Sequence, residues 1–252
     1  MKKILAPIIA ICALIMLTAC NSSEKIYEVY STGIEKFNQL DSLDMIVDVN
    51  MDMELNGETL KIPMNMILKS KSLNSDPEYL VNTSMTILDT ETTSQVYYKG
   101  GYVYLSASKN KYKQEMSLDD MKNNYAVVNV DLFDKELLEK ARLTKTEHGS
   151  TITLSLSGEK IEDKLTSMFF NMDTLLENFG GISSFKFGNL SATLSYNTEG
   201  YLTSEVIKYD ISCTADNTPL NANVKCAFNI NNPGKEVTIT PPDDLDSYIS
   251  IT

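Results

Sequence analysis

The residue best suited to chemistry in this chain is Cys20, which stands directly after the tripeptide Leu-Thr-Ala at 17–19. A cysteine sulfur is a nucleophile, and small residues in front of it are typical of a processing site. The apolar stretch 4–17 follows two lysines and is shorter than the ~20 residues that a membrane-spanning helix requires. The pattern predicts that residues 1–19 are a signal peptide, which is cleaved in front of Cys20.

These residues resemble the lipobox of bacterial lipoproteins, in which diacylglycerol is transferred to the cysteine sulfur before cleavage. Leu17 matches the apolar position of that motif, Thr18 and Ala19 match the small positions, and Cys20 is the lipid attachment residue. The resemblance implies a palmitate-type anchor of two or more acyl chains, which is enough for stable membrane attachment. We therefore expect the mature chain to be lipid-anchored at the extracytoplasmic face of the cell membrane. The alternative is an ordinary signal peptide followed by an incidental cysteine.

Enzymatic chemistry has little support in the rest of the chain. The one histidine, His148, lies in a predicted turn between Glu147 and Gly149, where a solvated side chain is expected. No serine stands in a G-x-S-x-G setting, and the spacings of zinc ligands and of a calcium-binding loop are absent. The acidic run 243–246 is interpreted as a solvated tail, with a weak cation site as the alternative. The sequence predicts no catalytic residues, no cofactor and no metal site.

The charge of the chain limits its partners. The formal net charge is −12, and loss of the signal peptide removes two further lysines. A chain this acidic is repelled by phosphate backbones and by anionic headgroups, which excludes nucleic acid and leaves the lipid anchor as the contact with the membrane. Because only a few residues separate Cys20 from the first predicted helix, the tether is very short and the folded body is expected to lie close to the bilayer.

The clearest structural pattern begins at Leu43, where apolar and polar residues alternate as far as Leu55. The pair Asn56-Gly57 follows, which favours a type I′ hairpin turn. Folding about this turn places apolar residues opposite one another: Met53 with Leu60, Met51 with Ile62, Val49 with Met64, and Val47 with Met66. Alternation and turn chemistry give the same register, so residues 43–68 are predicted to form a hairpin with one apolar face. The acidic residues Asp44, Asp48, Asp52 and Glu54 belong to its solvated face.

The remaining segments complete an α+β fold. Strands are predicted at 79–88, at 96–105 around Gly100-Gly101, at 152–156 after a turn at 148–149, at 185–196 with a bulge at 188–189, at 201–213 and at 220–230. Amphipathic helices are predicted at 24–40 with Ser22 or Ser23 as the cap, at 131–142 and at 158–179. We expect residues 20–252 to form a single domain: a strongly bent antiparallel sheet of about ten strands, or half-open barrel, whose concave apolar face is covered by two or three amphipathic helices.

This arrangement resembles the LolA and LppX type of lipoprotein carrier. Within that superfamily the chain is similar to uncharacterised lipoproteins of Gram-positive bacteria, a domain of unknown function. The closer likeness rests on the lipobox, the hairpin about Asn56-Gly57, and segments 73–76, 97–102, 156–160, 200–204, 232–234 and 240–248. The resemblance implies a bent sheet wrapped around helices, with an apolar cavity between them that holds acyl chains.

Methionines are the residues that point most directly to a ligand. Six of them share the predicted inward face of three neighbouring strands: Met45, Met51, Met53, Met64, Met66 and Met85. An unbranched, polarizable side chain adapts to irregular apolar surfaces. As a cavity lining, these residues indicate a binder or carrier of a lipid or another apolar small molecule. As ordinary core, they indicate the alternative, a non-enzymatic envelope scaffold or protein-interaction lipoprotein with a closed core.

Two cysteines remain in the mature chain besides Cys20, and one turn decides their state. A hairpin turn at 216–217 places Cys213 opposite Leu220 and Cys226 opposite Ile207, which is too far apart for a disulfide. A longer loop centred on 219–220 would instead bring the two sulfurs together. We expect the first arrangement, with two buried free thiols, and the second stays open.

Overall fold

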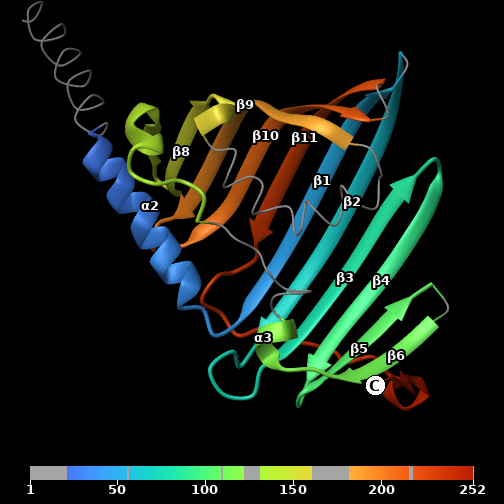
Figure 1. Ribbon diagram of the computed structural model, residues 1–252. Coiled ribbons are helices and arrows are strands. Elements are labelled where there is room, and N and C mark those ends of the chain that lie inside the picture. The colour runs from blue at the N-terminus through green and yellow to red at the C-terminus, as the bar shows by residue number, and fades with distance from the viewer. Residues whose placement is uncertain are drawn as a thin grey trace, which may run out of the picture.

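The computed structural model describes residues 22–55, 57–108, 110–121, 131–160, 182–215 and 218–251. They form one twelve-stranded sheet of order β12-β6-β5-β4-β3-β2-β1-β11-β10-β9-β8-β7, antiparallel except where β12 joins β6. The sheet is strongly bent and open, with β7 and β12 at its ends (Figure 1). Its strands are β1 (Leu43–Leu55), β2 (Glu58–Lys71), β3 (Glu78–Ile87), β4 (Thr90–Lys99), β5 (Tyr102–Ala107), β6 (Asn110–Glu115), β7 (Arg142–Thr146), β8 (Gly149–Leu156), β9 (Ile182–Asn197), β10 (Leu202–Ala215), β11 (Thr218–Ile230) and β12 (Ile249–Ser250).

One long helix, α2 (Ser23–Asn38), packs against the sheet, and its position follows from its sequence. Ser22 is the N-cap, and its hydroxyl accepts a hydrogen bond from the Lys25 N–H at 3.3 Å. Residues at three- and four-residue steps form the buried stripe of the helix, namely Ile26, Tyr30, Gly33 and Ile34. The predicted helix over 24–40 is confirmed to within two residues at its C-terminal end.

The register of the central hairpins agrees with the sequence prediction. Met53 pairs with Leu60, and Val47 pairs with Met66, as alternation and the turn predicted. Tyr97 pairs with Tyr104 across the turn at 100–101. The predicted bulge is present, because the pairing of β9 with β10 shifts between Leu190 and Phe187.

The two cysteines follow the register of the β10–β11 hairpin. Cys213 pairs with Leu220, and Cys226 pairs with Ile207. Both cysteines are free, as expected, but only Cys226 is buried, whereas Cys213 is partly exposed. The first of the two arrangements left open by the sequence is therefore confirmed, and the longer loop is wrong.

The sheet has two faces of different character. We call the face that packs against α2 the inner face and the opposite one the outer face. On β1 the inner face carries the odd-numbered apolar residues, of which Met45 and Val47 are buried with α2 in one core. The outer face of the same strand carries the acidic residues, and Asp48 accepts a hydrogen bond from the Asn65 side chain at 2.8 Å.

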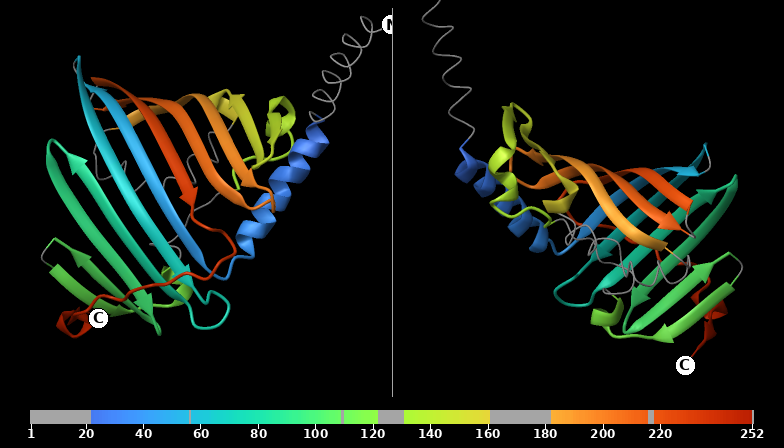
Figure 2. Two further views of the ribbon diagram at one scale, coloured as in Figure 1. Left: turned by 180° about the vertical axis from the view of Figure 1, so that it is seen from behind. Right: turned by 45° about the horizontal axis from the view of Figure 1, so that its top comes forward.

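The end of the chain covers part of the outer face. Residues 231–251, which we call the C-terminal strap, run behind the sheet from the end of β11 to the edge of β6 (Figure 2). Val237 and Ile239 of the strap are buried against Leu80 and Tyr97 of the outer face. The strap contains the 3-10 turn η4 (Leu245–Ser247) and ends at β12, which pairs in parallel with β6. Segment 240–251 is therefore a packed part of the fold, and the solvated tail expected for 243–246 is only partly correct, because Asp244 forms an ion pair with Lys111.

Two predicted helices need correction or lie largely outside the described residues. Residues 131–142 contain only the 3-10 turn η2 (Leu137–Lys140), because the Phe133 N–H donates to the Tyr30 hydroxyl at 2.9 Å and the segment packs on α2. Of the predicted helix at 158–179, the described residues include only the 3-10 turn η3 (Gly158–Lys160). Strands β7 and β8 form the hairpin predicted to turn at 148–149. The short helix α3 (Leu118–Met121) and strands β6 and β12 were not predicted, since their sequences are short or largely polar.

Candidate functional site

The inner face is divided into two parts by the burial of its side chains. Across β8 to β11 the packing is complete: Ile152, Leu194 and Ile207 have no exposed surface and share one core with α2. On β1 to β3 the inner side chains toward the β1–β2 and β3–β4 turns are only partly buried, as at Met51, Met64 and Met85. Toward the opposite ends of β3 and β4, Tyr79 and Tyr98 are buried in a second cluster with Met121. The inner face thus has a closed core across β8 to β11 and part of β1, and a partly exposed apolar region that adjoins this core on β1 to β3.

The structure places all six predicted methionines on the inner face, in two environments. Met45 has no exposed surface and belongs to the closed core. The other five are partly buried, and we call them the methionine patch: Met51, Met53, Met64, Met66 and Met85. Met64 is central to the patch, because it pairs with Val49 on one side and with Met85 on the other.

The methionine patch has a polar border on one side and exposed apolar residues at one end. Thr83 pairs with Met66 and Thr92 pairs with Met85, so hydroxyl side chains follow the methionines on β3 and β4. At the turn between these strands, Ile87 and Leu88 are 38% and 75% exposed. Apolar surface with a polar rim is typical of a binding surface rather than of scattered exposed residues.

A buried carboxyl group lies in the closed half of the inner face. Glu205 of β10 has no exposed surface and pairs with Leu194 on β9 and with Phe228 on β11. Among the described residues, neither of its carboxyl oxygens has a hydrogen-bond partner. Burial raises the pKa of Glu205 to about 8, so the carboxyl group is mainly protonated at neutral pH.

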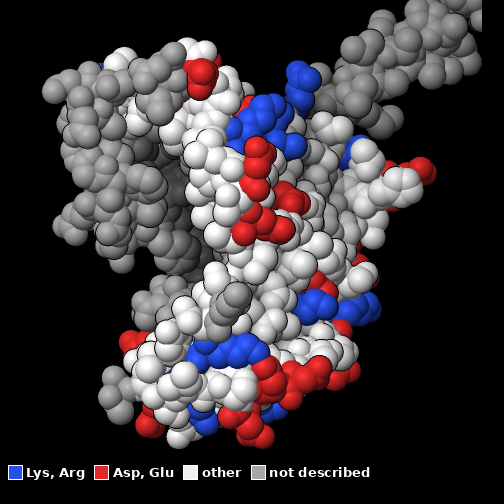
Figure 3. All heavy atoms as spheres, turned by 90° about the vertical axis from the view of Figure 1, so that its right-hand side faces the viewer, with Lys and Arg blue, Asp and Glu red and all other residues white. Residues whose placement is uncertain are grey.

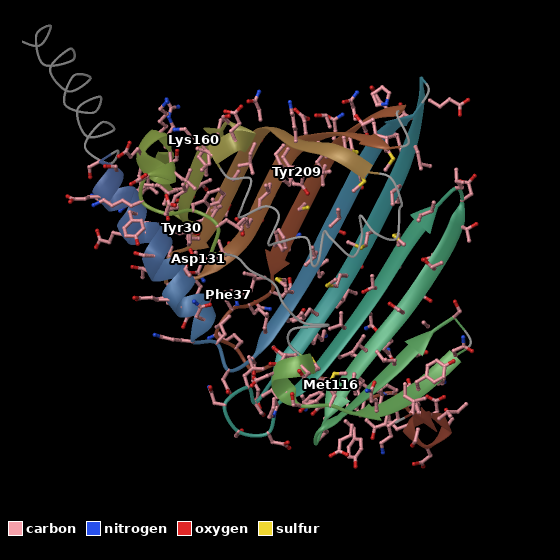
Figure 4. The ribbon with its side chains drawn as sticks, in the orientation of Figure 1. Tyr30, Phe37, Met116, Asp131, Lys160 and Tyr209 are labelled. Carbon is pink, nitrogen blue, oxygen red and sulfur yellow. The ribbon has the colours of Figure 1, made fainter. Side chains whose placement is uncertain are left out.

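Two tyrosines lie near this carboxyl group. The Tyr196 hydroxyl is buried and has no hydrogen-bond partner within the described ranges, and its pKa is raised first by burial and then by the charge of Glu205. Tyr30 of α2 instead donates to Oδ1 of Asp131 at 3.0 Å (Figure 4). Burial is again the main reason why the pKa of Tyr30 is raised, and Asp131 and Glu205 raise it further.

Gly33 allows α2 to approach the sheet at this place. A Cβ atom at position 33 would lie 2.3 Å from Cε1 of Tyr196, which is far inside van der Waals contact. The glycine in the middle of the helix therefore has a packing reason, despite its unfavourable helix propensity. It brings the helix backbone directly against the Tyr196 ring beside Glu205.

A second buried glutamate, on the outer face, has a complete set of partners. Glu78 is 2% exposed, and its carboxylate accepts hydrogen bonds from the Tyr97 hydroxyl at 3.0 Å and from Lys99 at 3.1 Å. Lys71 forms an ion pair with it at 3.1 Å. Burial on its own would raise the pKa of Glu78, but the three hydrogen bonds together lower it.

Lysine and acidic side chains are intermixed over the side of the molecule seen in Figure 3.

The outer face also carries a polar groove of about 810 Å³ across β1 and β8 to β11. It is lined by asparagine and serine side chains and by two lysines, Lys208 and Lys225, that lie directly opposite each other. Like charges at such a pair are unfavourable for the sheet. Acidic side chains, Asp52 and Asp210, lie in the same groove.

In the ranges that the structure describes, no group of three or more His, Cys, Asp or Glu side chains is placed to hold a metal ion. His148 is 87% exposed in its turn, with Nε2 at 3.3 Å from Oε1 of Glu147. No described helix is both long and apolar enough to cross a membrane. Cys20 lies outside the described residues.

Glu205 is the site residue that the sequence analysis missed. Its neighbours on β10 alternate, with Ile207, Tyr209, Ile211 and Cys213 in the apolar register. Glu205 occupies the same register, so a charged residue in the apolar phase of a strand was the available signal. The pattern of one strand does not show whether a partner faces that residue, because partners come from other elements.

Two solved structures are similar to this chain at low identity. The lipoprotein LppX of Mycobacterium tuberculosis is 10% identical, with a TM-score of 0.43, over 87% of this chain and 100% of that one. A DUF1329 family protein of Desulfovibrio piger is 7% identical, with a TM-score of 0.27, over 82% and 93%. Comparison with curated proteins finds no match. The model of DUF6612, a family of unknown function, matches residues 25–245, and the chain therefore belongs to this family.

Proposed function

We propose that this protein binds an apolar molecule, such as the acyl chain of a lipid, on the methionine patch of its inner face. The observation that carries the proposal is the partial burial of five methionines on three neighbouring strands, next to a closed core. An isolated core would bury these side chains completely. Flexible thioether side chains instead suit a surface that must fit chains of varying conformation.

The sequence supports a location at the membrane for this activity. The lipobox-like segment ending at Cys20 predicts a lipid anchor at the extracytoplasmic face of the cell membrane. With a short tether before α2, the anchored protein would lie where lipids are available. The activity proposed is binding or carriage and needs no catalytic group.

A tryptophan reporter tests the proposal directly, because the chain contains no tryptophan. We would introduce Met64→Trp in the patch and, as a matched control on the outer face of the same strand, Ile67→Trp. Oleyl alcohol that has been brominated across its double bond serves as the probe, since bromine quenches tryptophan fluorescence at short range. We expect saturable quenching at position 64 and none at position 67.

Chain length provides a second readout of the same experiment. Each methylene transferred from water to an apolar site contributes about 0.8 kcal/mol, or about four-fold in affinity. Unbranched alcohols of increasing length should therefore displace the probe at progressively lower concentrations. Equal quenching at both positions, or affinities independent of chain length, would overturn the proposal.

A second candidate function rests on the outer groove. The opposed pair Lys208 and Lys225, together with the Asn and Ser lining, favours an envelope scaffold or interaction protein that meets a polar partner there. This alternative predicts that the inner face binds no apolar molecule. Lipid extraction of protein purified from its native membrane separates the two, because only the first predicts a co-purifying apolar ligand.

A further inference from the structure

In the described part of the chain, some polar groups buried beneath α2 have no hydrogen-bond partner. Both carboxyl oxygens of Glu205 and the Tyr196 hydroxyl are buried without hydrogen-bond partners in the described part of the chain. A buried polar group without a partner loses its water and gains nothing in exchange, and such groups are rare in native proteins. Two such residues on adjacent strands therefore need a physical explanation.

Within the described ranges, nearby side chains do not supply the missing donors. The buried core around Glu205 includes aliphatic, aromatic and cysteine side chains, and none of the described lysine or arginine residues is buried. The nearest tyrosine of the helix, Tyr30, already donates to Asp131. Burial raises the pKa of Glu205 to about 8, which relieves the charge but leaves acceptor oxygens unused.

The position of Glu205 relates these groups to the methionine patch. Successive pairs across the sheet run from Glu205 to Phe228, then to Val47, and then to Met66. These three steps between strands span about 14 Å, at ~4.8 Å per step. One acyl chain reaches about 15 Å, which is half of the roughly 30 Å hydrocarbon core of a bilayer. A molecule with its chain on the patch therefore has the length to place its head at Glu205.

We propose that Glu205 and Tyr196 bind the headgroup of the apolar ligand, and that this headgroup is a hydrogen-bond donor, either an ammonium or a hydroxyl group. The inference rests on the proposed function, since it names the class of molecule that the patch accepts. A donor head satisfies the acceptor oxygens of the Glu205 carboxyl group and of Tyr196, whereas a carboxylate head offers only acceptors and places a charge without a counter-ion in a site without solvent. Because Gly33 lets α2 lie directly on Tyr196, the helix forms the roof of this head site.

Competition against the brominated probe tests the inference in the Met64→Trp protein at neutral pH. Dodecylamine, dodecanol and dodecanoate share one chain and differ only in the head. We expect the amine and the alcohol to displace the probe at about ten-fold lower concentration than dodecanoate, the effect of one good hydrogen bond. The additional change Glu205→Met should make the affinities for the three compounds nearly equal. Glu205→Gln should reduce the affinity for dodecylamine, relative to dodecanoate, more than it reduces the affinity for dodecanol.

The matched control is Glu159→Gln, at an exposed glutamate of η3, which should leave all three affinities unchanged. Folding of each variant is checked by circular dichroism, and Tyr196→Phe provides a second head-site variant in case Glu205→Met does not fold. If dodecanoate binds as well as the other two, or if Glu205→Met and Tyr196→Phe change nothing, the head site is overturned while the apolar patch stands. If the probe itself does not quench position 64, the proposed function fails and the head site fails with it.

Discussion

Two glutamates are buried in the same sheet, and their surroundings are opposite. Glu78, on the outer face, accepts hydrogen bonds from Tyr97 and two lysines, and its pKa is lowered. Glu205, on the inner face, has no partner in the described ranges, and its pKa is raised to about 8. Burial is nearly equal, with exposures of 2% and 0%. The supply of partners, and not depth, therefore separates a structural carboxylate from a candidate ligand group.

The sheet register explains the difference. Glu78 pairs with Lys71 across the β2–β3 ladder, so its main counter-charge is provided by the strand next to it. Glu205 pairs with Leu194 and Phe228, and its neighbours on both sides are apolar. Glu78 is therefore part of an ion pair, whereas Glu205 is a single polar side chain among apolar neighbours.

The largest expected effect is a loss of stability as the pH rises. Between pH 4.5, the ordinary pKa of a glutamate, and about 8, the unfolded chain has lost the Glu205 proton and the folded chain retains it. The unfolded state then binds fewer protons, so the free energy of unfolding falls across this window, by on the order of 4 kcal/mol. Tyr30, Tyr196 and Cys226 face the same carboxyl group, and their pKa values are also raised, so they stay protonated.

Urea unfolding followed by circular dichroism measures this fall in the free energy of unfolding. Measurements at about pH 5, 7 and 9 lie on both sides of the folded-state pKa of Glu205. Glu205→Gln cannot ionise and should show a nearly flat profile over the same range. Parallel profiles for the two proteins would mean that Glu205 is paired or solvated in the folded state.

Glu78 should behave in the opposite way. Its lowered pKa means that its contribution to stability is present above the ordinary glutamate value and is lost as the pH falls through the folded value. We expect Glu78→Gln to destabilise the protein by about 2 kcal/mol at neutral pH, because the amide keeps an acceptor oxygen for Tyr97 but removes the negative charge that faces the two lysines. Thermal unfolding is compared at about pH 7 and pH 3, on either side of the ordinary pKa of a carboxyl group. The variant should lose less stability on acidification than the unchanged protein. Glu115→Gln, at an exposed position on the same side, is the control.

The parts of this fold that could be predicted from sequence are those with two agreeing local signals. The β1–β2 register combined alternation with an Asn-Gly turn, and α2 combined an apolar stripe with the Ser22 cap. Segment 131–142 failed because Phe133 is held by Tyr30, a contact across about a hundred residues that no local pattern contains. The partners of Glu78 and the isolation of Glu205 depend on cross-strand neighbours, and these exist only once the whole sheet is assembled.

The closeness of α2 to the head site can be tested at Gly33. Gly33→Ala places a Cβ against the buried Tyr196 ring, so the helix must shift. Overpacking of this kind lowers the free energy of unfolding by about 1–3 kcal/mol. The better helix propensity of alanine offsets up to ~1 kcal/mol of this loss. We expect a net loss near 1.5 kcal/mol in urea unfolding. Thr32→Ala, one residue earlier on the exposed face, should be neutral or slightly stabilising, and an equal effect at both positions would mean that the contact is unimportant.

The smallest effect gives the sharpest contrast, because it removes a single oxygen from each region. Tyr97→Phe deletes a hydroxyl that donates to Glu78 at 3.0 Å, and it should lower the free energy of unfolding by about 1 kcal/mol. Tyr196→Phe deletes a buried hydroxyl that has no partner among the described residues, so it should leave stability unchanged or raise it by a few tenths of a kcal/mol. Both rings stay in place, and both positions are almost completely buried, so packing differences cancel in the comparison. If the two substitutions cost the same, the Tyr196 hydroxyl is already satisfied inside the protein and is not available to bind a ligand headgroup beside Glu205. If only Tyr97→Phe is destabilising, the oxygen at Tyr196 contributes nothing to folding, and binding is the role that remains for it.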